Sequence, residues 1–220
     1  MWRRGGVPRP HRSSPRSRRR RQCHGRDRGS HQGVSDVPKL RSFIAIELDR
    51  PTKERIAGWV SRIREPDDRI RWTAPATWHV TLRFLGDIDP NFVAPLRDTL
   101  REQLRDVPPF RTEWDRLAPF PPGRRPIVMA LHPKHDADLR ILAAKVEKAL
   151  AELRMSRERR RFNAHLTLGR FRGRAPSPVP SPHSEGAPIV IPVREVTLFE
   201  SELAPRGAVH HEMGRVVLAG

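Results

Sequence analysis

At 220 residues, the chain is long enough to bury a sizeable core, either in one domain or in two closely packed lobes. It carries 43 Lys and Arg against 25 Asp and Glu, a formal net charge of +18, and only 36% of its residues are hydrophobic. Because no apolar run approaches the roughly 18–20 residues that cross a bilayer, this composition excludes a membrane-spanning helix. The positive charge favours an anionic partner such as RNA, although a solvated basic surface explains it equally well.

The basic excess is strongest at the N-terminus. Residues 1–36 hold eleven Arg against two Asp and almost no apolar residues, so we expect residues 1–38 to be a disordered basic tail. Three interpretations are open: an arm that binds RNA phosphates, an inert extension, or the product of a start codon assigned too early, which we favour. The tail lacks the apolar stretch of a secretory signal, and the single cysteine, Cys23, excludes an intramolecular disulfide. The sequence therefore predicts a soluble, cytoplasmic protein.

Hydrophobic periodicity predicts the elements of residues 39–220. The first half is expected to run strand, helix, strand, strand, helix, at residues 41–49, 52–64, 69–73, 78–85 and 89–106. The second half is expected to hold two strands, a helix and three strands, at residues 110–117, 126–131, 136–153, 162–171, 189–201 and 209–218. The Pro/Ser-rich stretch 172–188 is predicted to be a mobile loop. Because a strand, a helix and a histidine-bearing strand recur, we predict an α+β fold of two pseudo-symmetric lobes, each an antiparallel sheet with outer helices.

The strands at 78–85 and 162–171 carry the same short motif. One contains His79-Val80-Thr81-Leu82 and the other contains His165-Leu166-Thr167-Leu168. Because side chains two residues apart share a face of a strand, each histidine lies beside its threonine, opposite the two apolar residues. We therefore expect the two polar faces to line a shared cleft between the lobes.

Two histidines that face each other can act as general acid and general base near neutral pH, as an in-line displacement at phosphorus requires. The hydroxyl groups of Thr81 and Thr167 can donate to phosphate oxygens and stabilise the charge that grows in the transition state. A metal site remains an open alternative, built from His79, His165 and a third ligand. The candidates for that third ligand are His132, His135 and Asp87. Otherwise we expect His132 and His135 to lie on the surface.

The segments HVTLRFLG and HLTLGRF resemble the two signatures of the 2H phosphoesterase superfamily. More narrowly, the chain resembles the bacterial and archaeal RNA 2′,3′-cyclic phosphodiesterases, also called 2′-5′ RNA ligases. The resemblance covers about residues 40–218, with RSFIAIEL before the first motif, FLGDID after it, APFPPGRRPIVMAL in the middle and VTLFESELAPRGA near the end. It departs from the family at Ala164, where a Pro is usual, and at His210, where the closing Gly-Ala-x-Tyr turn carries Tyr.

The resemblance implies a bilobal fold with a basic cleft and hydrolysis that needs neither metal nor cofactor. The substrate would be RNA ending in a 2′,3′-cyclic phosphate, and the product a 2′-phosphate, with ligation in vitro when a 5′-hydroxyl replaces water. His79 would donate a proton to the leaving 3′ oxygen, and His165 would accept one from water. Thr81 and Thr167 would hold the phosphate.

Three further residues are expected to bind substrate. Arg170 matches an Arg common in the family, although strict alternation directs it away from the face of His165. Arg83 lies two residues after Thr81 and is expected to contact phosphate, and Phe84 is expected to stack on a base. The protein is expected to act as a monomer, with no membrane or obligate protein partner. A non-catalytic RNA-binding protein and a 2H phosphodiesterase for a small cyclic nucleotide are the alternative functions.

Overall fold

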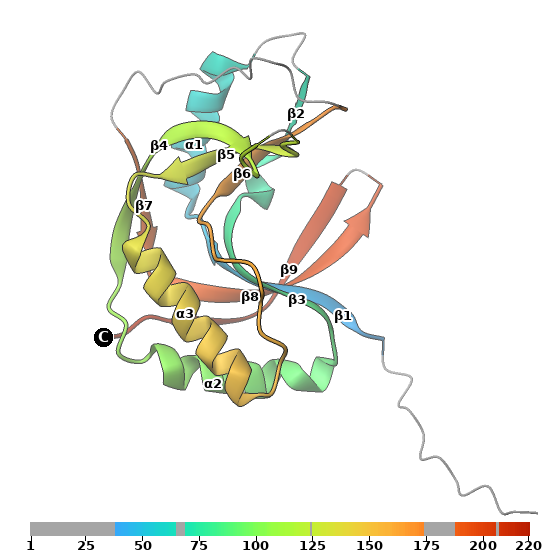
Figure 1. Ribbon diagram of the computed structural model, residues 1–220, viewed down its shortest axis with the longest axis vertical. Coiled ribbons are helices and arrows are strands. Elements are labelled where there is room, and N and C mark those ends of the chain that lie inside the picture. The colour runs from blue at the N-terminus through green and yellow to red at the C-terminus, as the bar shows by residue number, and fades with distance from the viewer. Residues whose placement is uncertain (1–37, 65–68, 124, 174–187, 206) are drawn as a thin grey trace, which may run out of the picture. The chain divides into compact units, whose positions relative to one another are not determined.

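The computed structural model describes residues 38–64, 69–123, 125–173, 188–205 and 207–220 (Figure 1). The chain divides into two units, residues 1–36 and 37–220, and the described residues all belong to the second. The predicted disordered tail and most of the predicted mobile loop therefore lie outside the described residues. No helix of the described part is long and apolar enough to cross a membrane.

The secondary structure follows the predicted order, with one additional strand. The first half comprises β1 (Leu40–Glu47), α1 (Arg50–Ile63), β2 (Ile70–Trp72), the 3-10 turn η1 (Pro75–Thr77), β3 (His79–Ile88), the 3-10 turn η2 (Pro90–Phe92) and α2 (Val93–Leu104). The second half comprises β4 (Phe110–Phe120), β5 (Val128–Pro133), α3 (Ala137–Glu152), β6 (Leu166–Phe171), β7 (Ile189–Val193), β8 (Glu195–Ala204) and β9 (Gly207–Val217).

The prediction of one strand over residues 189–201 is wrong, because two strands occupy this range. β7 pairs with β4 and β8 pairs with β1, so the chain passes from one half of the sheet to the other at Arg194. Pro192 has no N–H to donate and fits an edge strand, and β7 is the strand at one end of the sheet. Periodicity could not reveal this break, since buried apolar residues continue on both sides of it, with Val193 before and Val196 after.

The sheet of the described residues has nine strands in the order β7-β4-β5-β6-β3-β1-β8-β9, with β2 paired to β6. All pairs are antiparallel, and the two halves mirror each other about the junction of β6 and β3. A single residue pair in register, Val80 with Leu166, joins the halves at this junction. The predicted α+β fold with antiparallel lobes is confirmed, and the two motif-bearing strands are the ones that meet at its centre.

The helices begin and pack as their sequences predict. Asp49 caps α1, since its carboxylate accepts a hydrogen bond from the Thr52 N–H at 2.9 Å. Asp89 caps η2, the turn that leads into α2, by accepting from the Asn91 N–H at 2.8 Å. Helices α2 and α3 pack against each other along one side of the sheet (Figure 1).

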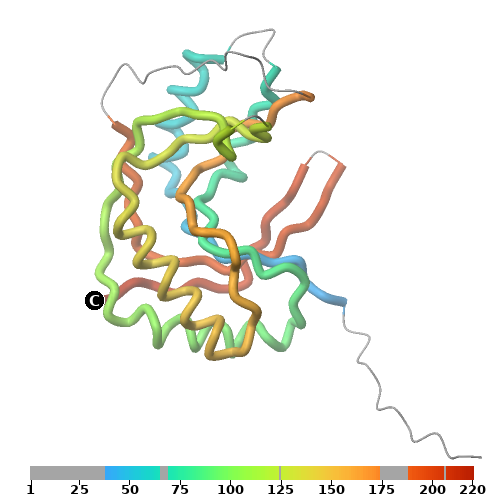
Figure 2. The backbone as a smooth tube through the Cα atoms, in the orientation of Figure 1, coloured from blue at the N-terminus to red at the C-terminus, as the bar shows by residue number. Residues whose placement is uncertain are grey.

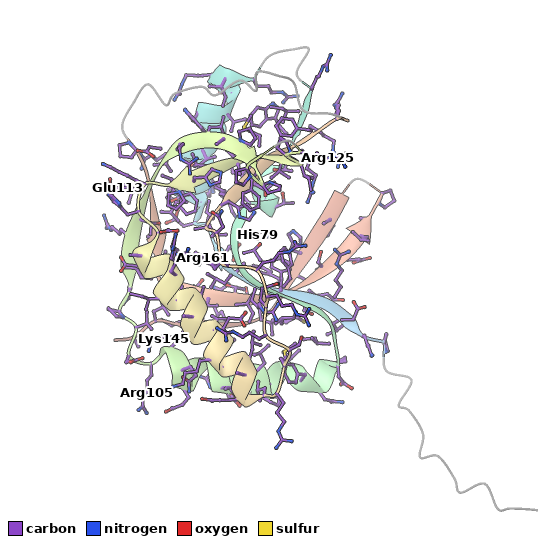
Figure 3. The ribbon with its side chains drawn as sticks, in the orientation of Figure 1. His79, Arg105, Glu113, Arg125, Lys145 and Arg161 are labelled. Atoms are coloured by element: carbon purple, nitrogen blue, oxygen red, sulfur yellow. The ribbon has the colours of Figure 1, made fainter. Side chains whose placement is uncertain are left out.

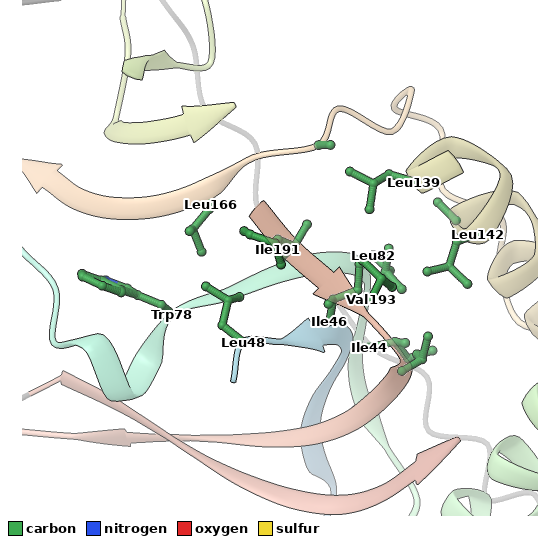
Figure 4. Close-up of a cluster of buried hydrophobic side chains, with 14 of the residues drawn as sticks. Ile44, Ile46, Leu48, Trp78, Leu82, Leu139, Leu142, Leu166, Ile191 and Val193 are labelled. Carbon is green, nitrogen blue, oxygen red and sulfur yellow. The ribbon is translucent and has the colours of Figure 1, made fainter. Parts of the chain in front are cut away.

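The core draws on both halves of the sheet and on the helices. Figure 4 shows side chains from β1, β3, β6, β7 and α3 converging. Ile44 and Ile46 of β1 lie beside Leu82 of β3, and Leu139 and Leu142 of α3 cover them. This shared core fixes the positions of β3 and β6, the strands that carry the two motifs.

Candidate active site

Each motif strand buries its apolar residues and presents its polar ones. In β3, Val80 and Leu82 are buried while His79 and Thr81 are partly exposed. Leu166 and Leu168 are likewise buried in β6, with Thr167 partly exposed between them and His165 placed just before the strand begins. The predicted alternation is confirmed through the His-x-Thr-Leu segments.

The polar faces of both motifs open onto one pocket of about 370 Å³ at the junction of the two halves. His79, Thr81, His165 and Thr167 all line it, and Figure 3 shows His79 at this junction. Its other lining residues include Arg41, Phe43, Arg71, Trp72, Phe84, Arg170, Ser201, Leu203 and His210. A larger cavity of about 760 Å³ contains neither motif, and several of its charged side chains pair with each other, such as Lys53 with Glu47 at 3.3 Å.

The two histidines are held in the same way. The Nδ1 atom of His79 lies 2.8 Å from the carbonyl oxygen of Thr77, and the Nδ1 atom of His165 lies 2.9 Å from that of Asn163. A carbonyl oxygen can only accept, so each Nδ1 carries the proton. In the neutral rings, both Nε2 atoms therefore keep a lone pair that can accept a proton.

The His79 ring lies among other aromatic rings. The Phe43 ring centroid is 4.7 Å away, and His210 packs edge-on at 5.1 Å with an interplanar angle of 90°. Burial lowers the pKa of His79 to about 4, outweighing the opposing effect of the Thr77 carbonyl, and the charges on His210, His165 and Lys53 lower it further. In the free protein His79 is therefore neutral at pH 7.

The His165 ring stacks on Phe120, with centroids 3.9 Å apart and an angle of 19° between the planes. Burial lowers the pKa of His165, while the bond to the Asn163 carbonyl opposes the change. Phe120 also contacts His132, at 6.0 Å between centroids. The expectation that His132 lies on the surface is wrong, because β5 is an interior strand of the sheet and this residue is only 5% exposed.

A bulge in each motif strand determines which residue follows the threonine into the pocket. In β3, Thr81 pairs with Ala45 and Arg83 with Ile44, so Leu82 is the extra residue. In β6, Thr167 pairs with Ala130 and Gly169 with Met129, so Leu168 is the extra residue. Because a bulge reverses the alternation beyond it, the third residue after each threonine faces the pocket in place of the second.

The bulge explains where the predicted substrate-binding residues lie. Phe84 and Arg170, each three residues after its threonine, line the pocket. Arg83 does not: its Nε lies 2.6 Å from the Glu147 carboxylate, and it donates to the Ser156 carbonyl at 2.5 Å. Only 10% of its side chain is exposed, so Arg83, which we expected to bind substrate, lies outside the pocket.

Two basic residues of the pocket, Arg41 and Arg71, were missed. Arg71 of β2 pairs directly with Arg170 of β6 and lines the same pocket. Like charges directly opposite each other destabilise a sheet, and within the described residues no carboxylate forms an ion pair with either arginine. An anion bound in the pocket would relieve this repulsion. The close pairing of β2 with β6 depends on Gly169, since a Cβ atom there would lie 2.4 Å from the Ile70 side chain.

The described residues contain no group of three or more His, Cys, Asp or Glu side chains that could hold a metal ion. Of the candidate metal ligands, His79 and His165 line the pocket. His132 is not among the lining residues, and its ring lies 6.0 Å from that of Phe120. Asp87 and His135 are not among the residues that line it.

Comparison with known proteins identifies the family to which the chain belongs. A family model described as the 2′-5′ RNA ligase superfamily matches residues 52–204. The chain belongs to the 2′-5′ RNA ligase superfamily. The family resemblance drawn from the two motifs is thereby confirmed.

Relatives within the superfamily match most of the chain. An RNA 2′,3′-cyclic phosphodiesterase of Methanothermobacter thermautotrophicus is 24% identical over 185 residues, covering 80% of this chain and 97% of the relative. Another, of Archaeoglobus fulgidus, is 26% identical over 176 residues, covering 79% and 98%. The apo crystal structure of E. coli LigT matches with a TM-score of 0.68 and 25% identity, covering 83% of this chain and 99% of LigT.

Proposed function

We propose that the protein is an RNA 2′,3′-cyclic phosphodiesterase that opens terminal cyclic phosphates to 2′-phosphates. The observation that carries this proposal is the pair of histidines in one pocket, each with Nδ1 on a backbone carbonyl and Nε2 left to exchange a proton. Relatives named RNA 2′,3′-cyclic phosphodiesterase that match along most of the chain support the choice of substrate.

In the reaction, water attacks phosphorus and the bond from phosphorus to the 3′ oxygen breaks. The bond from phosphorus to the 2′ oxygen remains, so the product is a 2′-phosphate. We assign His165 as the proton acceptor, because a neutral Nε2 can take the proton from the attacking water. We assign His79 as the proton donor to the leaving 3′ oxygen. Its strongly desolvated ring makes a strong acid once protonated, and the negative charge of the bound phosphate raises its pKa towards the working range.

The remaining polar groups hold the phosphate. The Thr81 and Thr167 hydroxyls belong beside the non-bridging oxygens, one from each strand. Arg170 and its neighbour Arg71 add positive charge on the side of His165, and Phe84, 62% exposed, offers a stacking surface on the side of His79. The same pocket would support ligation if a 5′-hydroxyl replaced water as the nucleophile.

We also propose that residues 39–220 form one catalytic domain and that the basic tail is dispensable for chemistry. The protein is proposed to work in the cytoplasm as a monomer without an obligate protein partner. Equal turnover by the full chain and by residues 39–220 would support this organisation. A tail that acts as an RNA-binding arm would instead raise KM when it is removed, more steeply at low salt.

The test uses the full chain, excess EDTA and an oligoribonucleotide ending in a 2′,3′-cyclic phosphate. Conversion to a 2′-phosphate, abolished by both His79→Ala and His165→Ala, is the expected result. His211→Ala is the matched control, since His211 does not line the pocket and its Nε2 lies 3.3 Å from Glu202. RNA binding without turnover would make the protein a binding module, and turnover of only mononucleoside cyclic phosphates would make it a small-nucleotide enzyme. Activity that EDTA destroys would indicate a metal-dependent reaction.

A further inference from the structure

A third imidazole, that of His210, lies in the pocket beside His79 and His165. The His210 ring, on β9, packs edge-on against His79 at 5.1 Å and against Phe43 at 5.0 Å. Phe43 in turn contacts His79 at 4.7 Å, so Phe43, His79 and His210 form a closed group of three rings, which we call the His79 ring cluster. Phe199 backs the cluster, stacked on Phe43 at 5.3 Å.

The β8–β9 hairpin delivers His210 to this position. The hairpin extends away from the rest of the sheet (Figure 2), and His210 pairs with Ser201 across it, with both residues lining the pocket. The next residue, His211, does not line the pocket, and its ring lies beside Glu202. Of the two consecutive histidines on β9, His210 therefore faces His79 and His211 does not.

The surroundings of His210 oppose a positive charge on its ring. Its Nδ1 atom is buried and has no hydrogen-bond partner within the described residues. An imidazolium carries a proton on both nitrogens, so protonation of His210 would leave a buried N–H without an acceptor. The neutral ring is therefore the form that fits these surroundings.

We propose that His210 is a positioning residue for His79: its ring holds the His79 imidazole in place, and its charge controls when His79 can carry the proton that it donates. This inference rests on the proposed phosphodiesterase function for its consequences in catalysis. The contact between the two rings itself does not depend on the identity of the substrate.

The electrostatics around the cluster set the direction of the effect. The charged and titratable groups around His79 and His210 come from the pocket lining and from residues just outside it. Outside the lining, Lys53 pairs with Glu47 and His211 lies beside Glu202; the lining contributes His165, Arg41, Arg71 and Arg170. Burial, and then the charge on His211, lower the pKa of His210. A charge on the His210 ring, which contacts the His79 ring at 5.1 Å, opposes a proton on His79.

Replacement of His210 by a ring that does not titrate separates its two roles. His210→Phe keeps an edge-on ring against Phe43 and His79 and removes the charge. We expect the midpoint of the His79 titration, followed by NMR in the free protein, to rise by about half a pH unit or more. His210→Tyr is expected to behave in the same way, because a phenol stays neutral below about pH 10. His210→Ala also removes the ring, and we expect it to lower kcat about tenfold as His79 loses its orientation.

His211→Gln is the matched control, and it should leave the His79 midpoint and kcat unchanged. A His79 midpoint that does not move in His210→Phe would overturn the inference, as would full kcat in a folded His210→Ala. A wild-type protein that turns over no cyclic phosphate would instead contradict the proposed function. The NMR midpoint tests the inference in either case, because it does not depend on turnover.

Discussion

The two halves of the pocket share a backbone and differ in the side chains mounted on it. Both motif strands hold a histidine by a carbonyl two residues earlier, and both bulge at the leucine after the threonine. Beyond the bulge, however, the half of His79 presents Phe84, and the half of His165 presents Arg170. One strand geometry, used twice, thus places an apolar residue on one side of the pocket and a cation on the other.

The surroundings of the two histidines follow the same division. His79 is enclosed by Phe43 and His210, which leaves it strongly desolvated. Among the described residues, His165 has one close aromatic neighbour, Phe120, and the basic residues Arg71 and Arg170 share its side of the pocket. The apolar side favours a strong acid, and the basic side favours binding of the phosphate beside the base. Substitution of residues in one half of the pocket at a time tests this comparison.

The largest effect is expected from loss of either histidine. His79→Ala and His165→Ala should each lower kcat by roughly 10²–10⁴-fold, since each removes one proton transfer. Steady-state turnover of a cyclic-phosphate oligoribonucleotide measures both losses. A variant that kept near wild-type kcat would show that only one of the two halves takes part in the chemistry.

The next largest effect, an increase in KM, is expected from substitution of Arg170 and Phe84, the pocket residues that follow the two bulges. Arg170→Ala should raise KM about 10- to 100-fold, because a charge-assisted contact to phosphate is lost. Phe84→Ala should raise KM less, by about tenfold, because stacking on a terminal base contributes roughly 1–3 kcal/mol. The KM increases of the two variants should become more similar at high salt, because salt screens the contact of Arg170 with phosphate and does not weaken stacking on Phe84. If Phe84→Ala had the larger effect on KM, the assigned division would be contradicted.

The buried histidine also makes stability depend on pH. The pKa of His79 is about 4 in the folded protein and about 6.5 in an unfolded chain, so its stabilising contribution is complete above about pH 6.5 and declines as the pH falls towards 4. Urea unfolding at about pH 7.5 and pH 4.5 should show wild type losing up to about 3 kcal/mol more than His79→Gln. The exposed His135, changed to Gln, is the control that should leave the difference unaltered.

The smallest effect on activity is expected from Arg83. Its guanidinium pairs with Glu147 and Glu158 away from the pocket, so Arg83→Ala should leave KM unchanged. Loss of this largely buried pairing should instead lower the free energy of unfolding by about 1–3 kcal/mol. An increase in KM matching that of Arg170→Ala would contradict the location of Arg83 outside the pocket.

Arg83 also shows how far the sequence could predict the site. Period-two alternation placed His79, Thr81, His165 and Thr167 correctly, because the strands are regular through each threonine. The same rule directed Arg83 into the pocket and Arg170 out of it, and both placements are wrong. The cause is the extra residue at Leu82 and at Leu168, which depends on pairing with β1 and β5 and has no signature within the strand itself.

Long-range pairing limited the prediction of the fold in the same way. The order of strands and helices was predicted from local patterns, with the 189–201 range as the exception. That Arg71 lies opposite Arg170, and that His210 reaches His79, follows only from the pairing of β2 with β6 and from the β8–β9 hairpin. These contacts join residues that are far apart in the chain, and a single sequence carries no direct signal for them.

The assignment of acid and base is tested most directly by changing the leaving atom. In a cyclic substrate with sulfur in place of the 3′ oxygen, the leaving thiolate needs no proton, because a thiol has a far lower pKa than an alcohol. We predict that this substrate restores His79→Ala to within about tenfold of wild type and leaves His165→Ala inactive. Rescue of His165→Ala in place of His79→Ala, or of neither variant, would contradict the division of roles between the two halves of the pocket.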